Sequence, residues 1–328
     1  MENILSTKIG FIGAGSIARS HILASIAAGF IPTAICGKNL SVRAKALSME
    51  IPGLEYFDNV DDFLKSDLDC ISILLNSDVS LRIYRTVIEQ KNIPVLIEKP
   101  VAQKSLELKN DLDLDRMNTL VGYNRRFYSS VIDVKEILDG STFIQSQWTI
   151  PEISWEKSPS SDNRHFFLLE NSVHILDLFL YLHGAPNQST FYNQNSNDFL
   201  QGSTSIHKFE KKAIAALTIS FGIPDNTSAS FYASSNYYLL KPFEILKKFT
   251  DITTEPANDL TPFKKYLPTE STKWQISEDD LSFKPGFLKQ YIELMSICRG
   301  NPRQVGASLR DAFNVLEFAE NIINAKNI

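Results

Sequence analysis

The chain has 328 residues, of which 43% are hydrophobic and 22% charged, and its formal net charge is -5. This composition is ordinary for a globular protein long enough for two domains, and it lacks the basic excess of nucleic-acid binders. No apolar run approaches the roughly 20 residues of a membrane helix, no signal peptide opens the chain and its three cysteines form no CxxC pair, so we expect a cytoplasmic protein with no metal, membrane or nucleic-acid partner.

From Lys8 to Tyr123, short apolar runs alternate with amphipathic stretches. The runs are KIGFIG, PTAIC, DCISILL, PVLIE and NTLVGY, and the stretches between them include residues 15–28, 41–48, 79–91 and 103–111. Continuous apolar strands separated by helices are typical of a parallel sheet covered on both faces. The pattern predicts an α/β Rossmann dinucleotide-binding domain over residues 1–123.

Beyond Tyr123 the pattern changes. We expect a helix at 129–138, the strand TFIQSQWTI, an apolar segment at 166–182, alternating runs such as STSIHKFE and TSASFYAS, long loops at 251–282, and helices at 286–299 and 306–325. Alternation indicates antiparallel strands with one solvated face. Residues 124–328 are therefore predicted to form an α+β domain with an open, mostly antiparallel sheet.

A glycine-rich turn follows the first strand in KIGFIGAGSIARSHI. Gly13 permits the tight turn, Gly15 lets the backbone approach a pyrophosphate, and Ala18 lets the helix pack against the sheet. With Ser16 and Ile17, these residues open a helix whose free N–H groups bind phosphate. The strand–turn–helix context predicts dinucleotide binding.

The second strand ends in AICGKNLSVRAKAL. A site specific for NAD normally has a carboxylate here to hold the ribose hydroxyls, whereas this chain has Gly37, followed by Lys38. A 2′-phosphate would meet no repulsion there, and Lys38 or Arg43 can pair with it. The alternative is that both are solvated surface cations. We expect NADP(H) to be favoured over NAD(H).

A polar stripe runs along the apolar segment LLENSVHILDLFLYLHG. At helical spacing Glu170, His174, Asp177 and Tyr181 fall on one face, and nearly all their neighbours are apolar. Because burying unpaired charge is costly, the stripe forms either an internal polar network or a site. The carboxylates flanking the histidine favour a site.

These residues resemble a family of NAD(P)-dependent oxidoreductases, named for glucose–fructose oxidoreductase, inositol dehydrogenase and rhizopine catabolism. The resemblance is carried by GFIGAGSIARSHI, VLIEKPVA, LVGYNRRF and ENSVHILDLFLYLHG, and extends through KPGFLKQYIELMSICRG. It implies that Lys99 lies beside the nicotinamide, that Pro100 sets the turn, often through a cis bond, and that His174 transfers a proton. Glu170 stands where the family usually has aspartate.

The loop after the fourth strand departs from the family's usual T-P-x-x-x-H. This chain has Asn76 near the proline position and Ser80 at the histidine. Asn76 and Glu98 are nevertheless predicted to contact the cofactor. In LVGYNRRF, Arg126 matches the family's recurrent arginine, whereas Arg125 occupies a variable position.

The resemblance implies hydride transfer between nicotinamide and a carbinol or ketone carbon of a sugar-like or nucleotide-sugar-like substrate, and surface-polysaccharide biosynthesis is the pathway it suggests. Lys99, His174 and Glu170 are the predicted catalytic residues. A homo-oligomer, dimer or tetramer, is expected through the C-terminal sheet. The alternatives are a non-catalytic dinucleotide-binding regulator of the same family and a reductase of a diol or tetrapyrrole. The residues expected on the substrate side are Tyr123, Arg126, Trp155, Arg164 and His165.

Overall fold

The computed structural model describes residues 7–38, 40–114, 118–152, 168–196, 199–210, 213–274 and 276–325. The chain forms two compact units. The first comprises Met1–Tyr128, Leu169–Asp177 and Glu278–Glu320, and the second comprises Ser129–Leu168, Leu178–Ser277 and Asn321–Ile328. Within the described residues, no helix combines the length and the apolar character needed to cross a membrane.

The first unit contains a six-stranded parallel sheet in the order β3-β2-β1-β4-β5-β6. This is the doubly wound order of a dinucleotide-binding fold and confirms the predicted fold class. Sequence analysis missed β3 and α3, because β3 (EYF) begins with an exposed glutamate and is no apolar run, and α3 has only four residues. The elements are β1 (Lys8–Ile12), α1 (Ala18–Ala27), β2 (Ile31–Cys36), α2 (Val42–Glu50), β3 (Glu55–Phe57), α3 (Val60–Phe63), β4 (Cys70–Ile73), α4 (Ser77–Gln90), β5 (Val95–Ile97), α5 (Ser105–Leu108), η1 (Lys109–Leu114), β6 (Thr119–Val121) and η2 (Asn124–Phe127).

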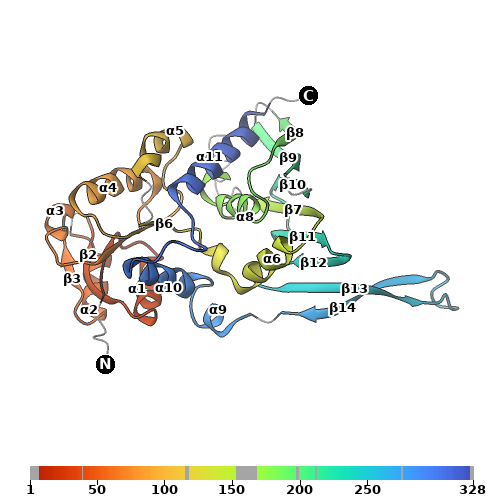
Figure 1. Cartoon of the computed structure of the whole chain (residues 1–328), viewed down its shortest axis with the longest axis horizontal. Helices are drawn as coiled ribbons and strands as arrows, with labels where there is room; N and C mark the ends of the chain where they lie inside the picture. The colour runs from red at the N-terminus through yellow and green to blue at the C-terminus, as the bar shows by residue number, and fades with distance from the viewer. Residues whose placement is uncertain are drawn as a thin grey trace. The chain divides into compact units, whose positions relative to one another are not determined.

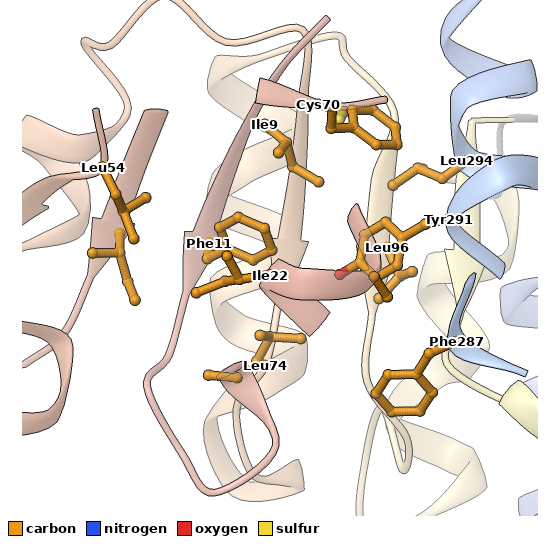
Figure 2. Packing of buried hydrophobic residues seen from close by; sticks show 14 of the residues in the cluster. Ile9, Phe11, Ile22, Leu54, Cys70, Leu74, Leu96, Phe287, Tyr291 and Leu294 are labelled. Atoms are coloured by element: carbon orange, nitrogen blue, oxygen red, sulfur yellow. The ribbon is translucent and has the colours of Figure 1, made fainter. Parts of the chain in front are cut away.

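The core of this unit joins the N-terminal sheet to a helix from near the end of the chain. Ile9 and Phe11 of β1 and Ile22 of α1 are fully buried. Figure 2 shows Tyr291 and Leu294 of α10 (Phe287–Cys298) in the same cluster as these side chains. The segment after residue 278, including part of α11 (Leu309–Asn324), therefore belongs to the dinucleotide-binding unit.

The second unit is built on an eight-stranded sheet in the order β14-β13-β12-β11-β7-β10-β9-β8 (Figure 1). Only β7 and β10 run parallel, and all other neighbours are antiparallel, as predicted. Trp148 packs against Phe179 and Phe231 with ring centroids 5.5 and 5.6 Å away. The elements are α6 (Ser129–Asp139), β7 (Ile144–Glu152), α8 (Val173–His183), β8 (Gln188–Ser196), β9 (Phe199–Lys208), β10 (Ala213–Phe221), β11 (Ser228–Ala233), β12 (Asn236–Leu240), β13 (Leu246–Glu255) and β14 (Lys265–Lys273). The first residues of α8, as far as Asp177, and the whole of α9 (Glu278–Ser282) belong to the first unit.

The expectation of long loops at 251–282 is wrong, because β13 and β14 form an antiparallel hairpin there. Figure 1 shows the two strands running well past β12 and β11. Most side chains of the hairpin are exposed on both faces, so hydrophobicity does not alternate along it. Backbone pairing and cross-strand contacts such as that between the hydroxyls of Thr253 and Thr269, 2.8 Å apart, hold it together instead.

Candidate functional site

The glycine-rich turn between β1 and α1 has the shape that a dinucleotide phosphate requires. Gly13 has φ of 109°, and a Cβ on it would lie 2.4 Å from the carbonyl oxygen of Leu74, so only glycine fits. A Cβ on Gly15 would meet no heavy atom within 4 Å. No side chain caps α1 at Ile17. The Ala18 N–H donates a hydrogen bond to the carbonyl oxygen of Gly15 at 3.1 Å, so the turn is closed by its own backbone. The open space at Gly15 and the start of α1 fit a dinucleotide phosphate.

The end of β2 leaves no space for the carboxylate that NAD-specific sites place there. A Cβ on Gly37 would lie 2.6 Å from Cβ of Ser41 and 2.7 Å from Cβ of Ala44. Ser41 caps α2 by accepting a hydrogen bond from the Ala44 N–H at 3.3 Å. The close start of α2 therefore excludes every side chain at position 37. Lys38 is exposed beside it.

Sequence analysis missed a carboxylate near the same loop. Asp58 follows β3, accepts a hydrogen bond from the Leu40 N–H at 2.8 Å, and accepts another from the Tyr56 hydroxyl. These hydrogen bonds lower the pKa of Asp58, that from Tyr56 contributing most. The signal was the aspartate in EYFD, which would have stood out if β3 had been recognised as a strand.

Lys99 lies just beyond the carboxyl end of β5. A cis peptide bond joins it to Pro100, and its Nζ donates a hydrogen bond to the carbonyl oxygen of Glu170 at 2.9 Å. Burial lowers the pKa of Lys99, and the carboxylates of Glu98 and Glu170 oppose this effect. The amine is thus held by a neutral acceptor in a partly desolvated setting.

Glu98 is fixed from two sides. Its Oε1 lies 3.3 Å from Nε2 of His21 on α1, and Nδ1 of His21 lies 2.9 Å from the Tyr291 hydroxyl, which lies 3.0 Å from Oγ of Ser72. On the other side, a Cβ on Gly122 would lie 2.4 Å from Oε1 of Glu98. Gly122 therefore leaves space for the side chain of Glu98. Because Glu98 is held in place, Lys99, the next residue, extends from a rigid backbone.

His174, in the first turn of α8, packs against the motif that follows β6. Its ring lies edge-on to Tyr123, with centroids 6.1 Å apart. Burial lowers the pKa of His174 well below its usual value, and the charges of Lys99, Arg125 and Lys284 lower it further. The imidazole is therefore neutral at physiological pH and able to accept a proton. In the described residues neither its Nδ1 nor the Tyr123 hydroxyl has a hydrogen-bond partner, although both atoms are buried.

The polar stripe is divided in the structure. A turn at residues 171–172 separates Glu170 from α8, and Oε1 of Glu170 accepts a hydrogen bond from Ser77 at 3.0 Å. Asp177 pairs instead with Arg126, with 2.6 Å between Oδ1 and Nη2. Burial raises the pKa of Asp177 to about 6, although Arg126 opposes it. The expectation of one helix face for both carboxylates is therefore wrong: Glu170 lies by Lys99, and Asp177 forms a buried ion pair.

The remaining predicted residues fall into two groups. Asn76 precedes α4 without capping it through its side chain, and Ser80 is fully buried with no partner for its hydroxyl among the described residues. Both belong to the first unit, with Tyr123 and Arg126. Trp155, Arg164 and His165 lie outside the described residues.

Comparison with protein families agrees with this geometry. Residues 7–119 match the model described as an oxidoreductase family with an NAD-binding Rossmann fold, and the match confirms the resemblance predicted from the sequence. No curated protein matches the chain.

Solved structures resemble nearly the whole chain. UDP-N-acetylglucosamine 3-dehydrogenase from Acidithiobacillus ferrooxidans has 16% identity, with 98% of each chain covered and a TM-score of 0.72. A dehydrogenase from Chromobacterium violaceum has 19% identity, with 98% of this chain and 96% of that chain covered and a TM-score of 0.79. Levoglucosan dehydrogenase in complex with NADH and L-sorbose has 15% identity, the same coverage and a TM-score of 0.74. At these identities the likeness establishes the fold.

Proposed function

Since residues 7–119 carry the NAD-binding Rossmann fold of an oxidoreductase family, we propose that the chain transfers a hydride between nicotinamide and a carbinol or ketone carbon of a sugar-like or nucleotide-sugar-like substrate. The observation that carries the proposal is the placement of Lys99. It follows a strand of the dinucleotide-binding sheet and contacts the segment that bears His174. The names of two similar structures support this substrate class. One is a dehydrogenase of UDP-N-acetylglucosamine, a nucleotide sugar, and the other is levoglucosan dehydrogenase in complex with L-sorbose.

The residues of the site divide the chemistry between them. Bound nicotinamide supplies the hydride donor or acceptor. In the oxidative direction, Lys99 Nζ donates a hydrogen bond to the substrate hydroxyl and orients it, and the neutral imidazole of His174 accepts the hydroxyl proton. The carbonyl of Glu170 orients the amine, while Ser77 holds the carboxylate of Glu170. The reductive direction reverses each proton transfer.

The test of this proposal is turnover by Lys99→Ala. We expect NADPH affinity to be retained, and turnover of an active member of a sugar and nucleotide-sugar panel to fall about 100-fold or more, the scale of a lost acid–base group. Lys104→Ala is the matched control, because Lys104 is exposed. Full activity of Lys99→Ala contradicts the proposal. If no panel member is turned over by the wild type, the non-catalytic regulator moves ahead.

The cofactor preference is a further part of the proposal. NADP(H) is favoured over NAD(H), because position 37 admits no carboxylate and Lys38 is exposed beside it. Asp58 lies close to the same loop and opposes this preference. The dissociation constants for NADPH and NADH test the preference, and tighter binding of NADH contradicts the proposed preference for NADP(H).

We also propose that the open face of the second unit's sheet binds a second copy of the chain. Along β10, buried side chains alternate with more exposed ones. On the exposed face, Ile214, Ile206, Tyr192 and Tyr232 retain more than 40% exposure, and their register places them on one surface across four strands. Apolar, weakly charged sheet faces of this kind pack against each other. Sedimentation should show a dimer or tetramer that Ile206→Asp weakens; a monomeric wild type contradicts this.

Two sequence-based predictions complete this picture. Residues 1–123 are proposed to bind the dinucleotide, and residues 124–328 to bind the substrate and form the oligomer. The protein is proposed to act in the cytoplasm.

A further inference from the structure

Arg125 and Lys284 lie on neighbouring loops of the first unit. Nδ2 of Asn124 donates a hydrogen bond to the carbonyl oxygen of Pro285 at 2.8 Å. A Cβ on Gly286 would lie 2.1 Å from the carbonyl oxygen of Asn124. The loop before α10 therefore lies directly against η2, and each cation is one residue away from this contact.

The same two cations lie near the proposed reacting groups. Tyr123, two residues before Arg125, packs edge-on against His174. Burial lowers the pKa values of His174 and Lys99, and the positive charges of Arg125 and Lys284 lower both further. The contact between the two loops and the packing of Tyr123 on His174 thus place both cations in the same part of the first unit as the imidazole.

Nothing in the described part of the chain neutralises Arg125 or Lys284 by an ion pair. Lys284 is exposed, and its amine lies 5.1 Å from the ring centroid of Phe287. The next residue, Arg126, is by contrast paired with buried Asp177. Arg125 is half-buried, and a partly desolvated guanidinium without a counter-ion is unfavourable.

The carboxylates of this region are engaged elsewhere. Glu98 contacts His21, Glu170 accepts a hydrogen bond from Ser77, and Asp280 accepts one from the Gly286 N–H at 2.9 Å. Among the described residues, the buried Tyr123 hydroxyl lacks a partner, as does Nδ1 of His174, and buried polar atoms in folded proteins are normally matched by water or a ligand. Excess positive charge and unmatched polar atoms thus coincide next to Lys99.

We propose that Arg125 and Lys284 bind an anionic group of the substrate, a carboxylate or a phosphate, beside the carbon that reacts at Lys99 and His174. This inference rests on the proposed function for the position of that carbon. Arg125 offers a fork of N–H donors and Lys284 a point charge, the usual pair for such anions. The pyrophosphate of the dinucleotide is provided for separately, at the glycine-rich turn and the start of α1.

The test is equilibrium binding to the full-length protein saturated with NADPH. The probes are glucose, glucuronate, glucose 6-phosphate and UDP-glucose, which separate a neutral sugar from a carboxylate, a phosphate monoester and a diphosphate. The proteins are the wild type, Arg125→Gln/Lys284→Gln, and the control Arg299→Gln, which removes an exposed arginine at the end of α10.

At least one anionic probe should bind the wild type tenfold or more tighter than glucose. The double variant should lose about 10- to 100-fold of that affinity, the scale of charge-assisted hydrogen bonds, with glucose and NADPH unchanged. The control should match the wild type.

Three results would overturn the inference: no anion binds better than glucose, the preference survives in the double variant, or NADPH affinity falls in parallel. The proposed function fails separately. If the anion binds as expected while Lys99→Ala keeps full turnover, the anion site stands and the proposed reaction does not.

Discussion

Gly122→Ala tests whether the position of Lys99 depends on the packing between LVGYNRRF and VLIEKPVA. The added methyl group would lie 2.4 Å from Oε1 and 2.8 Å from Cδ of Glu98, whereas ordinary contacts begin at 3.4 Å. The carboxylate must therefore retreat by about 1 Å from a buried position beside His21. Since Lys99 follows Glu98 directly, its amine moves too.

Two magnitudes follow from this displacement. Overpacking of a filled interior costs about 1–3 kcal/mol of unfolding free energy. A 1 Å misplacement of a reacting group costs about 100-fold in turnover. We therefore expect Gly122→Ala to lose both stability and activity. NADPH affinity should fall less than turnover, because the glycine-rich turn that is proposed to bind the phosphates follows β1.

Urea denaturation and steady-state turnover measure the two effects. Gly140→Ala is the matched control, because a Cβ there meets its nearest atom, the carbonyl oxygen of Glu136, at 3.6 Å. This control should be as stable and active as the wild type. If Gly122→Ala behaves like Gly140→Ala, Glu98 is not confined as the structure indicates, and the account of Lys99's rigidity is refuted.

Three further predictions concern other buried groups. Asp177→Asn removes the buried counter-ion of Arg126 and leaves it the more exposed carboxylate of Asp311, 3.6 Å from Nη1. Urea denaturation should therefore show a loss of about 3 kcal/mol of unfolding free energy; a loss below about 1 kcal/mol contradicts the buried pair. Burial lowers the pKa of His183 to about 3. Its contribution to folding stability is therefore present above the unfolded pKa of about 6.5 and is lost as pH falls toward 3. The melting temperature of His183→Gln should depend less on pH between 7 and 4 than that of the wild type, and equal slopes refute this. Glu170→Gln keeps an acceptor for Ser77 and the backbone carbonyl that holds Lys99, so turnover should fall less than about tenfold, whereas Glu170→Ala should lose more; equal losses contradict the role of the Ser77 contact.

The parallel sheet of the first unit was predictable because five of its strands lie in continuous apolar runs. The positions of Gly13 and Gly15 in a phosphate-binding turn were equally predictable, since such a turn requires a local backbone conformation and a close approach that only glycine allows. The strand β3 (EYF) is exposed or half-buried and forms no apolar run, unlike β5 and β6 of the same length. Its absence from the prediction hid Asp58. In β13 and β14, exposure on both faces removed the alternation by which strands are recognised.

The site was predictable as a set of residues but not as a geometry. Helical spacing placed Glu170 and Asp177 on one face, and the turn before Val173 sends them to Ser77 and Arg126 instead. The space that Gly122 leaves for Glu98 arises between segments more than 20 residues apart, so no local pattern reports it. Likewise, Lys284 comes near Arg125 through a tertiary contact between the loop before α10 and η2, which no local pattern reports.

The most direct measurement is a crystal structure of the protein with NADP(H) bound. We expect C4 of the nicotinamide to lie within about 5 Å of Lys99 Nζ and of the His174 ring, leaving room for one substrate oxygen between them. A nicotinamide ring bound away from Lys99, with the amine still held only by the carbonyl of Glu170, would contradict it.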